Sequence, residues 1–319
     1  MEDTGEAGKE EDQRPLYGIF LKIMSVTVFM AMSACIKAAS AHVPAGEAVF
    51  FRSLFAMPPI LAWLAMRGQF STAFRTNNPS GHFFRGLVGV SAMFCGFTAL
   101  GMIPLPEAVT IGYAAPLLAT VLAAMFLGER LRIYRMTAVF AGLAGVVLVL
   151  APRLSVMENG GAGSTEALGA IIALMGAVFA AMAQIFVRKL VGVEKTATIV
   201  LYFSLSASVL SLLSLPFGWV VPSPLEALLL VSAGVLGGLG QILLTASYRH
   251  AETAVIASFE YTSILLALAA GYFLFEEKPT LAMLAGAAMV IAAGLVIVIR
   301  ESRLGMERKN ARRAITPQG

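Results

Sequence analysis

The chain has 319 residues, of which 58% are hydrophobic and only 13% are charged. Soluble domains are about 25% charged, and a water-soluble fold of this size could not bury so much apolar surface in one core. The net charge of +4 arises in loops and tails, since residues 1–12 carry six acidic side chains and residues 300–319 carry six basic ones. The composition therefore excludes an ordinary soluble domain, and the positive charge does not indicate a nucleic-acid-binding surface.

Ten apolar stretches are each long enough to cross the hydrocarbon core of a membrane, which takes about 20 helical residues. They are unbroken and rich in Ala, Leu and Met, which favours helices over the alternating strands of a barrel. The first follows an acidic tail and is too long for a signal peptide, so we expect it to be retained. In chain order, the predicted helices cover residues 17–38, 47–66, 82–102, 107–127, 134–151, 168–187, 197–217, 226–247, 254–275 and 281–299.

Prolines lie within two of the predicted helices. Pro116 cannot donate a hydrogen bond to the carbonyl of Gly112, and Pro58 and Pro59 disrupt the second helix in the same way. We expect a kink at each position, which frees backbone carbonyls for a cavity or a gating motion. A static kink that serves packing alone is the alternative, and the residues themselves do not decide between the two.

Lysine and arginine are distributed unequally between the two sides of the predicted membrane. An even number of helices places both termini on one side. That side carries eighteen basic residues, against three on the other, which are Lys37, Arg153 and Lys278. Because basic loops stay in the cytoplasm, we expect both termini there, in a multi-pass protein of the bacterial inner membrane.

The two halves of the chain resemble each other at an offset of 146 to 151 residues. The aligned pairs include Gly18 with Gly169, Met24 with Met175, Lys37 with Arg188, Thr98 with Thr245, Ala108 with Ala254, and Tyr113 with Tyr261. Each repeat has five helices, an odd number, so the second enters the membrane in the opposite orientation. We therefore predict an all-α integral membrane protein whose ten transmembrane helices form two inverted five-helix repeats.

This interpretation divides the chain into five parts. Residues 1–16 form an acidic cytoplasmic tail and residues 17–151 form the first repeat of five helices. Residues 152–167 contain Gly and Ser and are the only long connector, which suits a flexible linker. Residues 168–299 form the second repeat, and residues 300–319 form a basic cytoplasmic tail.

Two segments resemble the EamA-type domain of the drug/metabolite transporter superfamily. They are residues 83–131, FFRGLVGVSAMFCGFTALGMIPLPEAVTIGYAAPLLATVLAAMFLGERL, and residues 246–277, ASYRHAETAVIASFEYTSILLALAAGYFLFEE, which resemble the second copy of the domain. Their GlyGluArg and GluGluLys ends fit the glutamate pattern of that family, although Glu276 stands where glycine is usual. The resemblance covers nearly the whole chain and implies a small-metabolite transporter, similar to amino-acid exporters or to importers of riboflavin or S-adenosylmethionine.

No energy-converting domain is visible in the sequence. There is no Gly-x-x-x-x-Gly-Lys-Ser/Thr loop to hold phosphates, and no soluble segment is large enough for an ATPase. His42, His82 and His250 lie at membrane boundaries and far apart in sequence, so we expect no metal site and no cofactor. Transport would have to be driven by a gradient.

Ionisable groups inside the predicted helices are the leading site candidates, because an unpaired charge in hydrocarbon costs at least a few kcal/mol. Glu260 lies about two turns into the ninth helix. It is interpreted as a proton-coupling carboxylate or a partner for a cationic substrate, and the alternative is a structural pair with a base on a facing helix. Arg52 lies about one and a half turns into the second helix, where it could attract an anionic group or extend to the membrane surface.

Four uncharged polar residues complete the candidate site. Gln184 and Gln241 lie in mid-helix and need hydrogen-bond partners, either from a neighbouring helix or from a ligand. Tyr113 and Tyr261 occupy equivalent positions in the two repeats, where they would line a midplane cavity or simply pack. The other charged residues near helix ends are interpreted as membrane anchors, topology determinants or local ion pairs, namely Lys22, Lys37, Arg85, Glu129, Arg188 and Glu277.

These features predict a secondary transporter that moves a small metabolite by alternating access through a cavity between the repeats. With few charges and available tyrosines, riboflavin uptake is the first expectation, and amino-acid export or S-adenosylmethionine uptake are the alternatives. The expected partners are a small-molecule substrate and the lipid bilayer, with no nucleic acid. A passive channel is a rival that the sequence does not exclude. A membrane-embedded enzyme is disfavoured, because no Ser/His or His/Asp grouping lies near an interface.

Overall fold

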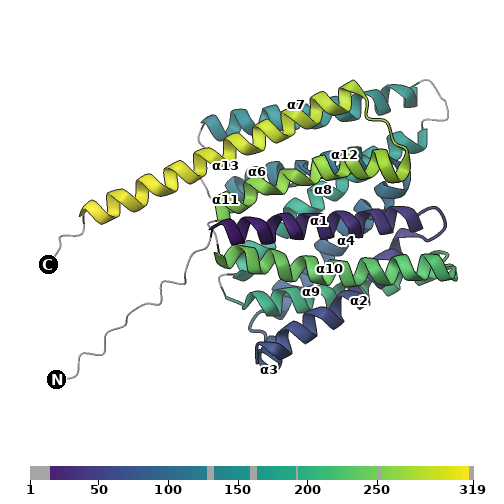
Figure 1. Cartoon of the computed structure of the whole chain (residues 1–319), viewed down its shortest axis with the longest axis horizontal. Helices are drawn as coiled ribbons and strands as arrows, with labels where there is room; N and C mark the ends of the chain where they lie inside the picture. The colour runs from purple at the N-terminus through teal and green to yellow at the C-terminus, as the bar shows by residue number, and fades with distance from the viewer. Residues whose placement is uncertain (1–14, 128–132, 159–163, 192, 251–252, 316–319) are drawn as a thin grey trace.

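The computed structural model describes residues 15–127, 133–158, 164–191, 193–250 and 253–315, and every regular element within these ranges is a helix (Figure 1). Ten helical segments within them are long and apolar enough to cross a membrane. The first covers 16–39 and the last 281–300, close to the ranges expected from hydropathy. The predicted all-α architecture with ten spans is therefore confirmed.

Thirteen α-helices and two short 3₁₀ helices make up these spans and their connections. The first half contains α1 (Pro15–Ala39), α2 (Ala45–Met66), α3 (Phe70–Ala73), α4 (Pro79–Met102), α5 (Leu105–Gly112), α6 (Ala114–Leu127) and α7 (Ile133–Glu158). The second half contains α8 (Ser164–Val191), α9 (Thr196–Ser211), η1 (Leu212–Phe217), α10 (Pro224–His250), α11 (Thr253–Ser258), η2 (Phe259–Tyr261), α12 (Thr262–Phe275) and α13 (Leu281–Ile315). The fourth span consists of α5 and α6, and the ninth of α11, η2 and α12.

The bundle has two ends that are easily told apart. The chain enters at the beginning of α1 and leaves along α13 at the same end, which we call the near end (Figure 1). The opposite, far end carries the connections from α1 to α2 and from α12 to α13. α4 begins at the near end with an N-cap. The Asn78 side chain accepts a hydrogen bond from the Gly81 amide, and Pro79 takes the first helical position.

Packing between the spans shows the inverted repeat. α1 packs lengthwise on α10, and α4 packs in the same way on α8. These are contacts between the first and third spans of opposite repeats, so exchanging the repeats turns one contact into the other. α2 faces α9 and α7 faces α13, and each of these pairs joins equivalent spans. This is the arrangement of two halves related by a pseudo-twofold axis.

The contact between α7 and α13 depends on two glycines. A Cβ atom on Gly145 would lie 2.8 Å from the carbonyl oxygen of Gly286, and one on Gly286 would lie 2.5 Å from the carbonyl oxygen of Gly145. The two backbones can approach this closely only because neither residue has a side chain.

Three expectations about helix limits differ from the structure. α2 runs without interruption through Pro58 and Pro59, and Gly238 on α10 leaves space for the Pro59 ring, so packing accommodates the prolines. The expected linker, 152–167, is shorter, because α7 continues past Pro152 to Glu158 and α8 begins at Ser164. α13 continues as a helix beyond residue 299 to Ile315. Residues 1–14 of the expected acidic tail lie outside the described ranges.

Candidate functional site

The fourth span of each repeat is interrupted inside the membrane. α5 ends at Gly112 and α6 begins at Ala114, with Tyr113 between them. Pro116 explains this interruption, because its missing N–H leaves the Gly112 carbonyl without its helical partner, and the kink expected there is confirmed. The equivalent interruption in the second repeat is η2, which has no proline and which the sequence did not indicate.

The two interruptions meet through a pair of tyrosines. The rings of Tyr113 and Tyr261 stack with their centroids 4.9 Å apart and an interplanar angle of 28°. The Tyr113 hydroxyl donates to the carbonyl oxygen of Glu260 at 2.5 Å and lies 2.6 Å from Oγ of Ser263. Because a phenol has one hydrogen, Ser263 is the donor in the second contact. The repeats are thus joined at the 3₁₀ turn η2, through the carbonyl of Glu260.

Glu260 forms an ion pair with a lysine of the first helix. Its Oε2 atom lies 3.7 Å from Nζ of Lys22, and the side chains are 53% and 2% exposed, respectively. Lys22 is seven residues into α1, about 10 Å below the near end at 1.5 Å per residue. The interpretation of Lys22 as a membrane anchor is therefore wrong, because the residue is buried against a carboxylate on a facing span.

Arg52 does not extend to the membrane surface. It is 5% exposed, and its Nε atom is buried without a hydrogen bond. A Cβ atom on Gly237 of α10 would lie 3.1 Å from this Nε, so the side chain occupies the space that the glycine leaves. The alternative of a surface-seeking arginine is wrong for this residue.

Arg85 is the site residue that sequence reasoning missed. Its guanidinium lies 3.3 Å from the ring centre of Phe203, and its Nε and Nη1 atoms are buried without hydrogen bonds. The span that carries Arg52, α2, contacts α4. One residue in the sequence could have indicated that Arg85 turns into the bundle. This is Gly89, one helical turn further along α4, where a Cβ atom would lie 3.0 Å from Nη1 of Arg85.

The two glutamines lie in different places. Gln184 lines a pocket of about 430 Å³ between α4, α8 and α9, together with Arg85 and Phe203. Gln241 lines a much smaller recess between α2, α9 and α10. The structure therefore brings Gln184 together with Arg85, and with Arg188, which lines the same pocket, but not with Arg52. Gln241 lines a different recess, to which neither these arginines nor the tyrosine pair contribute.

At the far end, a lysine and a glutamate connect four spans. Nζ of Lys37 lies 2.9 Å from Oε1 of Glu277 and donates to the carbonyl oxygens of Leu100 and Ile103 at 3.0 and 2.8 Å. The other Glu277 oxygen accepts from the Leu105 amide at 2.8 Å, at the start of α5. Lys37 is thus a partner of α4 and α12 rather than a membrane anchor, and Glu277 forms a long-range pair. The equivalent Glu129 lies outside the described residues.

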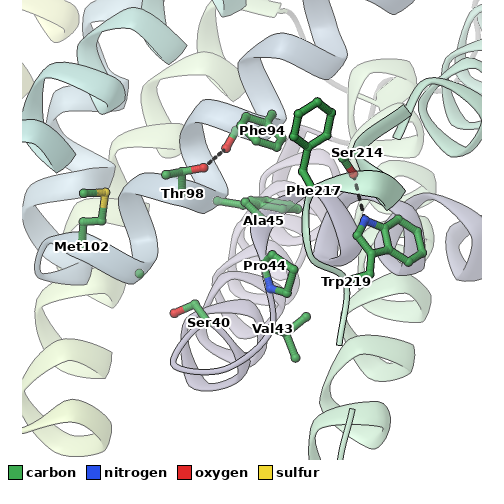
Figure 2. A pocket seen from close by; sticks show the side chains of 13 residues that line it. Ser40, Val43, Pro44, Ala45, Phe94, Thr98, Met102, Ser214, Phe217 and Trp219 are labelled. Atoms are coloured by element: carbon green, nitrogen blue, oxygen red, sulfur yellow. Dashed lines mark hydrogen bonds between the residues drawn. The ribbon is translucent and has the colours of Figure 1, made fainter. Parts of the chain in front are cut away.

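A half-open cavity of about 360 Å³ also lies at the far end, beside the turn from α1 to α2 (Figure 2). Ser214 and Phe217 of η1 and Phe94 and Thr98 of α4 face it, and the Trp219 indole donates to Oγ of Ser214 at 3.0 Å. None of the lining residues is charged, so this opening can admit a solute without selecting its charge.

Glu194 organises the near-end loop that precedes α4. Its carboxylate accepts hydrogen bonds from the Thr76 hydroxyl at 2.6 Å and from the Asn77 and Asn78 amides at 2.7 and 3.0 Å. These donors, the Thr76 hydroxyl first, hold the pKa of Glu194 below its usual value. Among the described residues, no three His, Cys, Asp or Glu side chains gather as metal ligands would.

Ten spans in two inverted repeats, joined at interrupted helices and carrying buried charges, define a multi-pass membrane protein built like a secondary transporter. The model of the EamA-like transporter family matches residues 16–151 and 167–299, one copy in each half. The chain belongs to this family, as its resemblance to EamA-type domains implied.

Curated relatives of this chain are named as transporters, which points to a transporter rather than an enzyme. The pseudopaline exporter CntI of Pseudomonas aeruginosa is 31% identical over 284 residues, which is 88% of this chain and 95% of the relative. The S-adenosylmethionine uptake transporter of Rickettsia bellii is 27% identical over 257 residues, 81% and 84% of the two chains. A crystal structure at 22% identity matches 90% of this chain and 98% of the other with a TM-score of 0.63, which shows a shared fold.

Proposed function

We propose that this protein is a proton-coupled secondary transporter that exports a small metabolite across the bacterial inner membrane by alternating access. The observation that carries the proposal is the meeting of two interrupted helices, one from each repeat, beside an ion pair inside the membrane. The excess of basic residues on the side of the termini supports a cytoplasmic near end. The 31% identity to a named exporter supports the direction.

The Lys22–Glu260 pair is the coupling element in this proposal. Glu260 is half-exposed and Lys22 is buried. The carboxylate is therefore the member of the pair that a proton from the near end can reach, whereas the amine is covered. Protonation of Glu260 removes the charge that stabilises buried Lys22, which makes the contact between α1 and η2 unfavourable. The Tyr113 hydroxyl holds the carbonyl of the same glutamate, so a change at Glu260 is transmitted to the fourth span.

The relatives favour two kinds of cargo, S-adenosylmethionine or a compound like pseudopaline. Riboflavin uptake, the first expectation from the sequence, draws no support from them. Between the two directions that the relatives represent, we propose export, and uptake of S-adenosylmethionine is the second candidate because four relatives with that name match at 27–28% identity.

The test is flux of labelled S-adenosylmethionine and labelled riboflavin in proteoliposomes with an imposed proton gradient, measured in both directions. We expect S-adenosylmethionine flux that an uncoupler abolishes, and no riboflavin flux. Glu260→Gln should lose the response to the gradient, whereas the matched control Glu276→Gln, an exposed carboxylate at the far end, should keep it. Flux in the parent that is insensitive to the uncoupler would instead identify a passive channel.

A further inference from the structure

Two arginines on neighbouring spans are buried inside the bundle, Arg52 on α2 and Arg85 on α4. Arg52 lies seven residues into α2 from the far end, and Arg85 lies six residues into α4 from the near end. Each Cα is therefore about 10 Å inside its own end of the bundle at 1.5 Å per residue. Their side chains extend towards the middle, because Arg85 reaches Gly89, one turn deeper, and Arg52 reaches Gly237, thirteen residues into α10.

Neither guanidinium has a carboxylate partner among the residues that the structure describes. Three of their nitrogen atoms, Nε of both and Nη1 of Arg85, are buried without any hydrogen bond. Arg153 shows the usual solution, since it forms a bidentate pair with Glu107 at 3.0 and 2.8 Å and a further contact with Glu166. A buried positive charge without such a partner opposes folding, and the bundle holds two of them.

The space beside Arg85 can hold a ligand. The pocket between α4, α8 and α9 has a volume of about 430 Å³, and Arg85, Gln184 and Phe203 line it. Arg85 supplies a positive charge and Gln184 an amide that can donate or accept, and both groups suit a planar oxyanion. Gly89 also lines this pocket, and a Cβ atom there would lie 2.7 Å from the Phe203 ring and 3.0 Å from Nη1 of Arg85, so the glycine leaves room for the ring and the guanidinium.

We propose that Arg85 and Gln184, supported by the charge of Arg52 on the neighbouring span, bind the carboxylate of the transported metabolite. This assignment rests on the proposed transport function and narrows its cargo to compounds that carry a carboxylate. Binding supplies the negative charge that the two arginines lack, so the occupied site is more favourable than the empty one. A lipid phosphate presents the same oxyanion chemistry, and the experiment below separates the two sources.

The first measurement needs no substrate. In neutral phosphatidylcholine nanodiscs, Arg52→Met should raise the Tm of the ligand-free protein by about 2 °C or more, because it removes an unpaired buried charge. Arg85→Met should act in the same direction, with a smaller gain because the Phe203 contact is lost. The matched control, Arg153→Met, should lower the Tm, since it leaves two glutamates unpaired. A lower Tm for Arg52→Met would overturn the proposal.

The second measurement compares S-adenosylmethionine with its decarboxylated analogue, which differs only in the carboxylate. The parent should bind the intact compound at least about tenfold more tightly, and Arg52→Gln or Arg85→Gln should reduce this ratio to about one. Equal affinities in the parent overturn the proposal, as does stabilisation by phosphatidylglycerol that disappears in the arginine variants. Because the Tm comparison involves no transport, it separates failure of this site from failure of the transport function.

Discussion

The far-end junction of Lys37 and Glu277 should contribute measurably to stability. Both side chains are largely buried, at 13% and 15% exposure. Glu277→Ala removes the charge partner of Lys37 and leaves the Leu105 amide without an acceptor, which alone costs about 1–3 kcal/mol. Lys37 keeps two carbonyl acceptors, so losing its ion pair costs less than the 3–5 kcal/mol of a fully buried pair. We expect a total loss of about 2–4 kcal/mol.

Glu277→Gln separates the charge from the hydrogen bonds. The amide oxygen can still accept from Leu105 and Lys37, so only the charge-assisted part of these bonds is lost, about 1–2 kcal/mol. The assay is equilibrium unfolding in bicelles of the parent, Glu277→Gln, Lys37→Met and the double variant. The double-mutant cycle should give a coupling energy of about 1–2 kcal/mol. Effects that add to within about 0.5 kcal/mol would refute the reasoning.

Three further predictions concern single positions. Glu276 ends α12 with φ +55°, a left-handed conformation that costs a residue with a side chain about 1–2 kcal/mol, so Glu276→Gly should raise the free energy of unfolding by about 1 kcal/mol. At pH 7, Glu194→Gln should lower it by about 1–3 kcal/mol; because the folded pKa is depressed below the ordinary 4.5, this difference should shrink as the pH falls below that value. A Cβ atom on Gly294 would overlap the hydroxyl of Tyr261, so Gly294→Ala should destabilise the protein by about 1–3 kcal/mol and slow transport.

Each of these has its own control. Glu276→Ala retains a side chain at the same φ and should bring none of the gain. A Glu194→Gln difference that stays constant from pH 7 to pH 3 would contradict the assigned hydrogen bonds. Combining Gly294→Ala with Tyr261→Leu should recover stability, and a double variant as unstable as Gly294→Ala alone would show that the overlap is not the cause.

Sequence reasoning predicted the spans because burial in lipid follows from the residues of one segment at a time. The internal repeat then predicted that Tyr113 and Tyr261 are equivalent, and the structure stacks them. The departure at Glu276 from the glycine usual in the family likewise corresponds to a left-handed residue. Features that depend on local composition or on the internal symmetry could therefore be predicted from the sequence.

Partners across the bundle could not be predicted in this way. Lys22, Lys37 and Arg85 stand within about two turns of a helix end, where a lysine or arginine commonly extends to the membrane surface. Their true environment depends on which span faces each of them, and sequence spacing contains no record of that. Glu260 lies 3.7 Å from a base on a facing helix, Lys22, a partner that the sequence did not identify.

The packing of α1 on α10 has a consequence for how the chain is made. The Ser25 hydroxyl donates to the Gly240 carbonyl, a partner 215 residues later in the chain. The separation between Lys22 and its partner Glu260 is greater still. At about 5–20 residues per second of synthesis, the first helix spends roughly 10–50 seconds in the membrane before either partner emerges from the ribosome. During that interval its lysine has no carboxylate from η2, so the nascent chain depends on lipid headgroups, water or an insertion factor to shelter this charge.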